Sequence, residues 1–263
     1  MRVATAQLPD LDNSDDRIFT TANAVIVLDG ASAFVPVPIP AAAYADTLGR
    51  EVQQRLTDEP AAELANTLAD AIAATATALD LTPGESPSAT VAIARVRAGH
   101  VDVLMLGDTQ VVLPDQIIRD DRLGALGFAA SRKYRDRLAS GTGYDDEHRD
   151  LLRELQTEQA KHRNRDGGYW IAEATPDAAY HAITTRRPTD EVPWLVLATD
   201  GAYTPMQHLG LDDWPHVAAA TSRDLGAVLA RCHQWEADDD PNGRALPRAK
   251  RHDDKSLAAI SGV

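Results

Sequence analysis

Two short apolar runs, each leading into an Asp-Gly pair, constrain the fold of this chain more than any other feature. The runs are Ala24–Leu28 and Trp194–Ala198, and the pairs are Asp29-Gly30 and Asp200-Gly201. A continuously apolar run of this length predicts a strand buried on both faces, and the glycine lets the backbone turn or approach another segment closely. A carboxylate at such a strand end lies at the rim of the core, where an uncompensated negative charge is costly. Two such carboxylates suggest a shared cation.

Two further acidic pairs lie near the ends of the chain. Asp15-Asp16 precedes the Ile18-Phe19 pair, and Asp253-Asp254 precedes the apolar segment Leu257–Ile260. All four acidic points could meet on one sheet edge. Carboxylate oxygens together with a backbone carbonyl suit hard cations such as Mg²⁺ and Mn²⁺, so the sequence predicts a site for such ions.

The order of expected elements is that of an α+β protein. Strands come first, then a helix pair, a hairpin, a charged helix, a last helix and a closing strand, unlike the strict alternation of a doubly wound sheet. The apolar spacing predicts helices over 41–56, 64–79, 145–161 and 222–235, and hairpin strands over 90–96 and 101–106. The proline-rich loop 35–40 should border Asp29.

Composition limits the cellular context and the partners. With 263 residues and one cysteine, Cys232, the chain can bury a core without disulfides. Cys232 falls in an apolar series at helical spacing, so we expect a packed core thiol rather than a nucleophile. A net charge of −14 disfavours nucleic acid and acidic membranes. No apolar stretch approaches the roughly 20 residues of a membrane helix, so we expect a cytoplasmic protein, for which a monomer is the simplest state.

Several other chemistries lack their sequence signatures. The chain has no glycine-rich phosphate loop, no Gly-x-Ser-x-Gly elbow and no paired zinc ligands, and Asp238–Asp240 lacks the ligand spacing of a calcium loop. His252, directly before Asp253, has two interpretations: a surface histidine, or a general acid that reaches a leaving oxygen.

A set of short motifs runs through the chain in a fixed order, each against a predicted strand. The set comprises Asn13–Arg17, Val27–Ser32, Ser88–Val91, Leu106–Thr109, Ala198–Gly201 and Asp253–Ser256. In this order the motifs resemble those of the metal-dependent protein phosphatase 2C family. Each motif alone is weak because Asp-Gly pairs are common in turns, whereas the ordered set is much more specific.

The resemblance implies a fold and an activity. The fold would be a four-layer α/β/β/α sandwich of two antiparallel sheets flanked by antiparallel helices, forming a single domain over 1–263 with a flap around 122–170. The activity would be hydrolysis of phosphoserine or phosphothreonine in a protein substrate, by direct attack of a hydroxide activated by two Mn²⁺ or Mg²⁺ ions, with a weaker third ion as an additional feature.

The resemblance also implies roles for individual residues. Asp29 resembles the carboxylate that bridges both ions, and the Gly30 carbonyl would bind the second one. Asp200 and Asp253 resemble the other ligands of the first ion, so Asp29, Asp200 and Asp253 are the expected catalytic residues. Asp15 stands in place of a glutamate that serves the second ion.

The remaining acidic residues have secondary roles in this scheme. Asp16 would orient water without touching a metal, and Asp120 or Asp121 resembles the residue that holds the third ion. Asp254 falls where the family often has asparagine, which leaves Asp253 as the ligand or implies a slip of one residue. Asp108 is expected to be structural, bonded to neighbouring backbone amides.

Some positions depart from the family pattern and leave a second function open. The family's phosphate-binding arginine is absent from Pro9–Asp12, with Arg17 and Arg2 as possible substitutes, and Asp15 is one methylene shorter than glutamate. These changes favour a pseudophosphatase, a non-catalytic module that binds a phosphorylated partner or a metal. Retention of Asp29, Asp200 and Asp253 favours the enzyme, because a metal-free site would hold repelling carboxylates without compensation.

Overall fold

Each apolar run predicted as a buried strand lies inside a sheet of the computed structural model, which describes all 263 residues. β3 (Ala24–Gly30) pairs with β2 (Arg17–Thr20) and β4 (Ala89–Arg97), and β9 (Trp194–Ala198) pairs with β10 (Lys255–Ser261) and β6 (Gln110–Val112). β5 (His100–Leu106) and β8 (Ile183–Pro188) complete the first sheet, and β1 (Arg2–Leu8) and β7 (Ile117–Ile118) complete the second. Their orders are β2-β3-β4-β5-β8 and β1-β10-β9-β6-β7, and every pairing is antiparallel.

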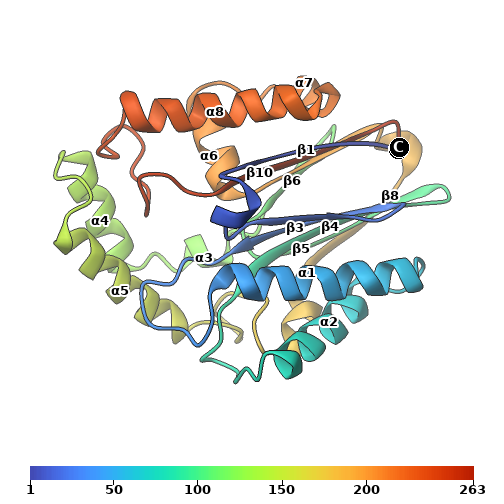
Figure 1. The fold of residues 1–263 in the computed structure, drawn as a ribbon, viewed down its shortest axis with the longest axis horizontal. Helices are drawn as coiled ribbons and strands as arrows, with labels where there is room; N and C mark the ends of the chain where they lie inside the picture. The colour runs from blue at the N-terminus through green and yellow to red at the C-terminus, as the bar shows by residue number, and fades with distance from the viewer.

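The alternation of side chains along the two central strands builds the layers. Val25 and Val27 of β3 face Leu195 and Leu197 of β9 in a core between the sheets. Residues of the opposite parity, such as Ile26, pack outward against helices. Because helices also cover the outer face of each sheet, both strands are buried on both faces and are apolar along their length (Figure 1).

The helices form the two outer layers of the sandwich. α1 (Ala41–Asp58) and α2 (Leu64–Ala78) cover the sheet that holds β3. α6 (Asp200–His208), α7 (Trp214–Ala219) and α8 (Ser222–Asp238) cover the other sheet. The expected four-layer α/β/β/α architecture is confirmed, as are the helices and the hairpin predicted from periodicity.

The chain between β7 and β8 leaves the sandwich and forms a separate helical segment. It contains α3 (Arg122–Ala125), α4 (Ala129–Ala139) and α5 (Asp146–Ala160), of which only α5 was predicted. α4 and α5 pack on each other at one end of the molecule (Figure 1) through a small cluster of Tyr134, Leu138, Leu151 and Leu152. α4 escaped prediction because it buries only three side chains in a strongly charged sequence.

The Asp-Gly pair after β9 does not form the turn that its composition suggests. Asp200 and Gly201 are instead the first residues of α6, which starts directly after the strand. None of the helices is both long enough and apolar enough to cross a lipid bilayer.

Candidate active site

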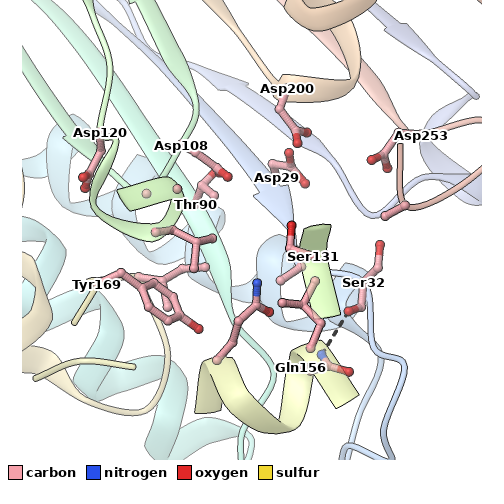
Figure 2. Close-up of a pocket in the computed structure, with 18 of the residues that line it drawn as sticks. Asp29, Ser32, Thr90, Asp108, Asp120, Ser131, Gln156, Tyr169, Asp200 and Asp253 are labelled. Carbon is pink, nitrogen blue, oxygen red and sulfur yellow. Dashed lines mark hydrogen bonds between the residues drawn. The ribbon is translucent and has the colours of Figure 1, made fainter. Parts of the chain in front are cut away.

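A cavity of about 660 Å³ lies between the strand ends of the sandwich and the α3–α5 segment. One wall carries Asp29, Asp108, Asp200 and Asp253, here called the cavity carboxylates. In Figure 2 the carboxyl groups of Asp29 and Asp200 point toward each other, and Asp253 approaches from the side. Ser131 of α4 and Gln156 of α5 lie on the opposite wall.

Both sheets contribute to this acidic wall. Asp29 is near the end of β3, while Asp200 follows β9 and Asp253 precedes β10. Gly201 allows Asp200 and Asp253 to lie close together, because a Cβ atom at position 201 would overlap the carbonyl oxygen of Asp254. The close contact of α6 with the 253–254 loop thus brings Asp200 beside Asp253.

The electrostatics of the cavity favour the binding of protons or cations by its carboxylates. Burial, reinforced by Asp16 and Asp200, raises the pKa of Asp29 well above its usual range. Burial and the charge of Asp253 raise the pKa of Asp200 to about 8, although a hydrogen bond with Asp29 partly offsets this. Without a cation, burial and the neighbouring carboxylates therefore favour the protonated form of Asp29, and divalent ions would replace such protons with a charge that the carboxylates can share.

Asp16 lies beneath the cavity rather than on it. It is fully buried, and its Oδ2 accepts a hydrogen bond from Thr199 Oγ1 at 3.0 Å, while Oδ1 has no partner. Burial raises the pKa of Asp16 to about 7, and its charge in turn raises the pKa of Asp29. Asp16 thus adjoins the centre without lining the cavity, and its unpartnered oxygen offers one more acceptor there.

Asp15 and Asp254 hold the surrounding loops together. The backbone N–H of Asp15 donates to Asp254 Oδ2 at 2.6 Å, and Asp15 Oδ1 accepts from the N–H of Ala42 at the start of α1 at 3.1 Å. Neither residue lines the cavity, whereas Asp253 does. Gly30 fits against this loop because a Cβ atom there would lie 2.8 Å from the Asp15 carbonyl oxygen.

The acidic residues considered for a third ion differ in their availability. Both oxygens of Asp120 accept hydrogen bonds from Arg122, and Asp121 is exposed just before α3, although both line the cavity. Asp108, which was predicted to be structural, lies among the cavity carboxylates, and burial raises its pKa. The sequence contains a signal for Asp108: like Asp29, it lies at the end of an apolar strand and beside a glycine.

Basic residues reach the cavity from positions that the sequence analysis did not consider. Lys250 Nζ lies 2.6 Å from Asp253 Oδ1. Burial opposes the charge of Lys250, but the negative charges of Asp253, Asp254 and Asp29 outweigh it and raise the lysine pKa. Arg119 also lines the cavity, donates to Gln110 Oε1 at 2.6 Å and lies over the Tyr203 ring.

Four residues considered from sequence lie away from the cavity. Arg17 is buried and donates to the carbonyls of Ser14 and Asp16, and Arg2 donates to the carbonyl of Ala219, so both were wrong as substitutes for a phosphate-binding arginine. His252 pairs with Glu236 outside the cavity, which contradicts its interpretation as a general acid. Cys232 is a buried core thiol, as expected, and burial raises its pKa to about 11.

The fold agrees with comparisons to known proteins. The family model for protein phosphatase 2C matches residues 7–237. A bacterial serine phosphatase structure is 15% identical with a TM-score of 0.56, covering 100% of this chain and 99% of that one. The catalytic domain of the serine/threonine phosphatase PstP, in complex with two manganese ions, is 14% identical with a TM-score of 0.53, covering 98% and 96%.

A further structural neighbour comes from Mycobacterium smegmatis. The PPM Ser-Thr phosphatase MsPP in complex with cacodylate is 15% identical with a TM-score of 0.53, covering 98% of this chain and 97% of that one. No curated protein sequence matches the chain. Since the family model spans most of the sequence and the neighbours share the fold over its whole length, the chain belongs to the protein phosphatase 2C family.

Proposed function

We propose that this protein is a metal-dependent phosphomonoester hydrolase that acts on phosphoserine or phosphothreonine in a protein substrate, in the cytoplasm. The observation that carries the proposal is the convergence of Asp29, Asp200 and Asp253 from both sheets, with Lys250 as the only basic side chain in contact with them. Placing like charges together is unfavourable and raises the pKa values of Asp29 and Asp200. We infer that the fold brings these residues together because the site binds cations.

The donor set fits divalent ions such as Mn²⁺ or Mg²⁺. We assign Asp29 as the ligand shared by two ions, Asp200 and Asp253 as further ligands of the first, and the Gly30 carbonyl and Asp15 as ligands of the second. Asp108 replaces Asp121 as our candidate for a weaker third ion, because Asp121 is exposed and Asp108 lies with the other carboxylates. Bound ions would polarise the phosphoryl oxygens and lower the pKa of a water nucleophile.

The remaining residues would bind the substrate and exclude water. Lys250, with its ammonium group beside Asp253, is placed to bind phosphoryl oxygens in the role that the missing arginine leaves vacant. Gln156 ties α5 to the loop after Asp29, since its Oε1 accepts from the N–H groups of Phe34 and Val35. We propose that residues 122–170 act as a flap over the cavity, within a single domain spanning 1–263.

A pseudophosphatase remains the alternative, and one observation favours it. The Lys250–Asp253 ion pair supplies an internal positive charge to one of the proposed metal ligands. A chain that needed no metal could use such a lysine to stabilise an otherwise repulsive site. In that case the cavity would bind a phosphorylated partner without hydrolysing it.

Hydrolysis of p-nitrophenyl phosphate separates these functions. We expect turnover with Mn²⁺ or Mg²⁺ and none in EDTA. Asp253→Asn should remove most of the activity, whereas Asp254→Asn, the matched control on the neighbouring residue, should reduce it mildly. Absence of turnover with every divalent metal would overturn the enzyme proposal, and a reversed order of the two variants would show that Asp254 is the ligand.

A further inference from the structure

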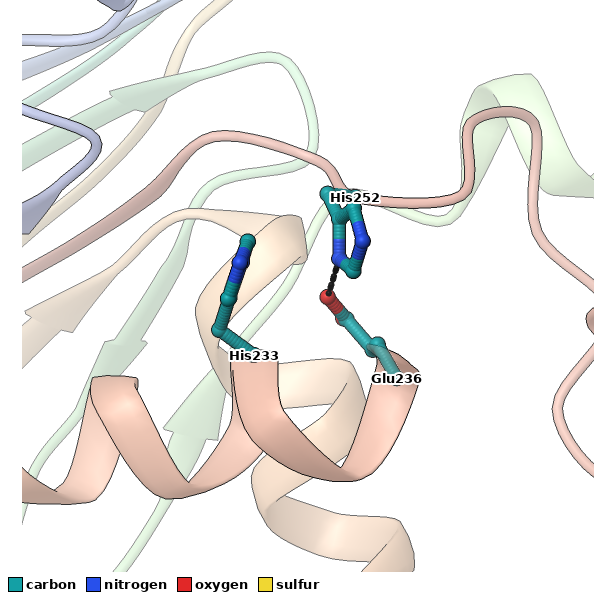
Figure 3. A group of neighbouring side chains, drawn as sticks. All are labelled: His233, Glu236 and His252. Carbon is teal, nitrogen blue, oxygen red and sulfur yellow. Dashed lines mark hydrogen bonds and ion pairs between the residues drawn. The ribbon is translucent and has the colours of Figure 1, made fainter. Parts of the chain in front are cut away.

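Outside the cavity, two histidines and a glutamate gather at the C-terminal end of α8. His233 and Glu236 are three residues apart on α8 and share one face, and His252 approaches them from the loop that leads to Asp253 (Figure 3). The three potential ligand atoms lie within 4.8 Å of one another. None of the three side chains lines the cavity, and the proposed phosphatase chemistry uses none of them.

The spacing of these ligand atoms is close to that of a tetrahedral metal site. His252 Nδ1 lies 3.1 Å from Glu236 Oε2. Ligands about 2.0 to 2.1 Å from a zinc ion at tetrahedral angles are roughly 3.3 Å apart. The histidine rings of residues 233 and 252 lie side by side, with centroids 4.1 Å apart, which places His233 near enough to supply the third ligand.

Glu236 supplies the charged ligand of this group. Glu236 is almost fully buried and supplies a negative charge, and its Oε2 accepts a hydrogen bond from Lys255 Nζ at 2.9 Å and lies 3.1 Å from His252 Nδ1. Burial and the neighbouring His252 lower the pKa of His233, which favours the neutral imidazole that a metal ligand requires. His233 is exposed, so an ion can enter from solvent.

We propose that His233, Glu236 and His252 form a second metal site that binds Zn²⁺ or a similar borderline transition-metal ion, with water as a fourth ligand. Imidazole nitrogens distinguish this site from the all-oxygen cavity, because Mg²⁺ prefers oxygen ligands and Zn²⁺ binds nitrogen well. Lys255 links the two regions, since its ammonium group bonds both Glu236 and the carbonyl of Asp253. The second site does not depend on phosphatase activity.

Cobalt titration tests the proposal, with Co²⁺ as a spectroscopic probe for Zn²⁺. The titration is carried out on the full chain in millimolar Mg²⁺, which occupies the oxygen site, and repeated with the Asp29→Asn variant, which weakens that site. We expect one equivalent of Co²⁺ with the visible absorption of a nitrogen-containing tetrahedral site in both proteins, and displacement of the cobalt by Zn²⁺.

Histidine variants locate the ion. His233→Gln and His252→Gln should each weaken Co²⁺ binding by at least about tenfold, which corresponds to 1.4 kcal/mol. The matched control is His100→Gln, which changes an exposed histidine on β5 far from α8. Circular dichroism and urea unfolding verify that the variants fold. The proposal is overturned if the wild-type protein binds no cobalt saturably, or if binding survives in both histidine variants.

Discussion

The buried acid Asp102 and the half-buried cavity carboxylates are neutralised in opposite ways. Asp102 on β5 is surrounded by Arg95, Arg97 and Arg186, with N···O distances of 2.9, 2.7 and 2.6 Å. Burial opposes the charge of Asp102, but hydrogen bonds from Arg186 and Arg95 outweigh it and lower the pKa. In the cavity, by contrast, the pKa values of Asp29 and Asp200 are raised, and Asp253 pairs with one lysine, Lys250.

The contrast distinguishes Asp102, which has a structural role, from the cavity carboxylates, which we propose bind cations from solution. The arginine partners of Asp102 lie in the same sheet, so the folded chain itself neutralises the charge of this carboxylate. The negative charges of the cavity carboxylates are fully neutralised only when protons or metal ions bind from solution. The first group should therefore determine stability and the second should determine activity.

Asp29→Asn should give the largest effect. Removing the charge shared by two ions should lower kcat for p-nitrophenyl phosphate at saturating Mn²⁺ by about a thousandfold, or about 4 kcal/mol. Asp102→Asn is the control and should retain turnover per folded molecule. More than a tenth of wild-type turnover in Asp29→Asn would contradict the bridging role.

Asp102→Asn should mainly affect folding. It leaves the fully buried Arg95 without its carboxylate partner, so we expect the free energy of unfolding to fall by about 3 kcal/mol, as for other broken buried ion pairs. Asp29→Asn should instead stabilise the metal-free protein, because it removes repulsion. Urea unfolding in EDTA measures both changes, and equal losses in the two variants would break the comparison.

Mn²⁺ should stabilise the folded chain mainly through the cavity carboxylates. At a Mn²⁺ concentration 100 times Kd, binding to the folded state adds about 2.7 kcal/mol. Thermal melts should show a Tm that rises with Mn²⁺ in the wild type and in Asp102→Asn, with little response in Asp29→Asn. A Tm that ignores millimolar Mn²⁺ would show that the carboxylates form no shared metal site.

The pH dependence of stability should give the smallest effect, with opposite signs for the two groups. The pKa of Asp200 in the folded chain is raised from 3.8 to about 8, so its contribution is present below 3.8 and is lost as pH rises toward 8. The pKa of Asp102 is lowered, so its contribution is present above the unfolded value and is lost as pH falls.

Unfolding in EDTA at several pH values tests this prediction. The free energy of unfolding should decrease between about pH 5 and pH 8, and Asp200→Asn should flatten that decrease. With saturating Mn²⁺ the slope should also diminish, since the ions replace the protons. If the free energy of unfolding instead rises over this pH range in EDTA, ionisation of the cavity carboxylates does not destabilise the folded chain.

Sequence patterns predicted the features that are local in the chain. The buried strands at 24–28 and 194–198 and the helices with regular apolar spacing are correct because periodicity reflects burial directly. The roles of Asp108 and Lys250 depend on which loops meet in space, and short polar segments carry no such information. α4 was missed for a related reason, because its stability comes from packing on α5 rather than from its own pattern.

The division of the cavity carboxylates between two sheets has a consequence for how the protein reaches its working state. Asp29 comes from one layer near the start of the chain, and Asp253 comes from the other layer near its end. No intermediate in which only one sheet has formed can gather both residues. Binding of the proposed metal ions would therefore report complete assembly, because the site exists only after the two halves of the sandwich have docked in their final alignment.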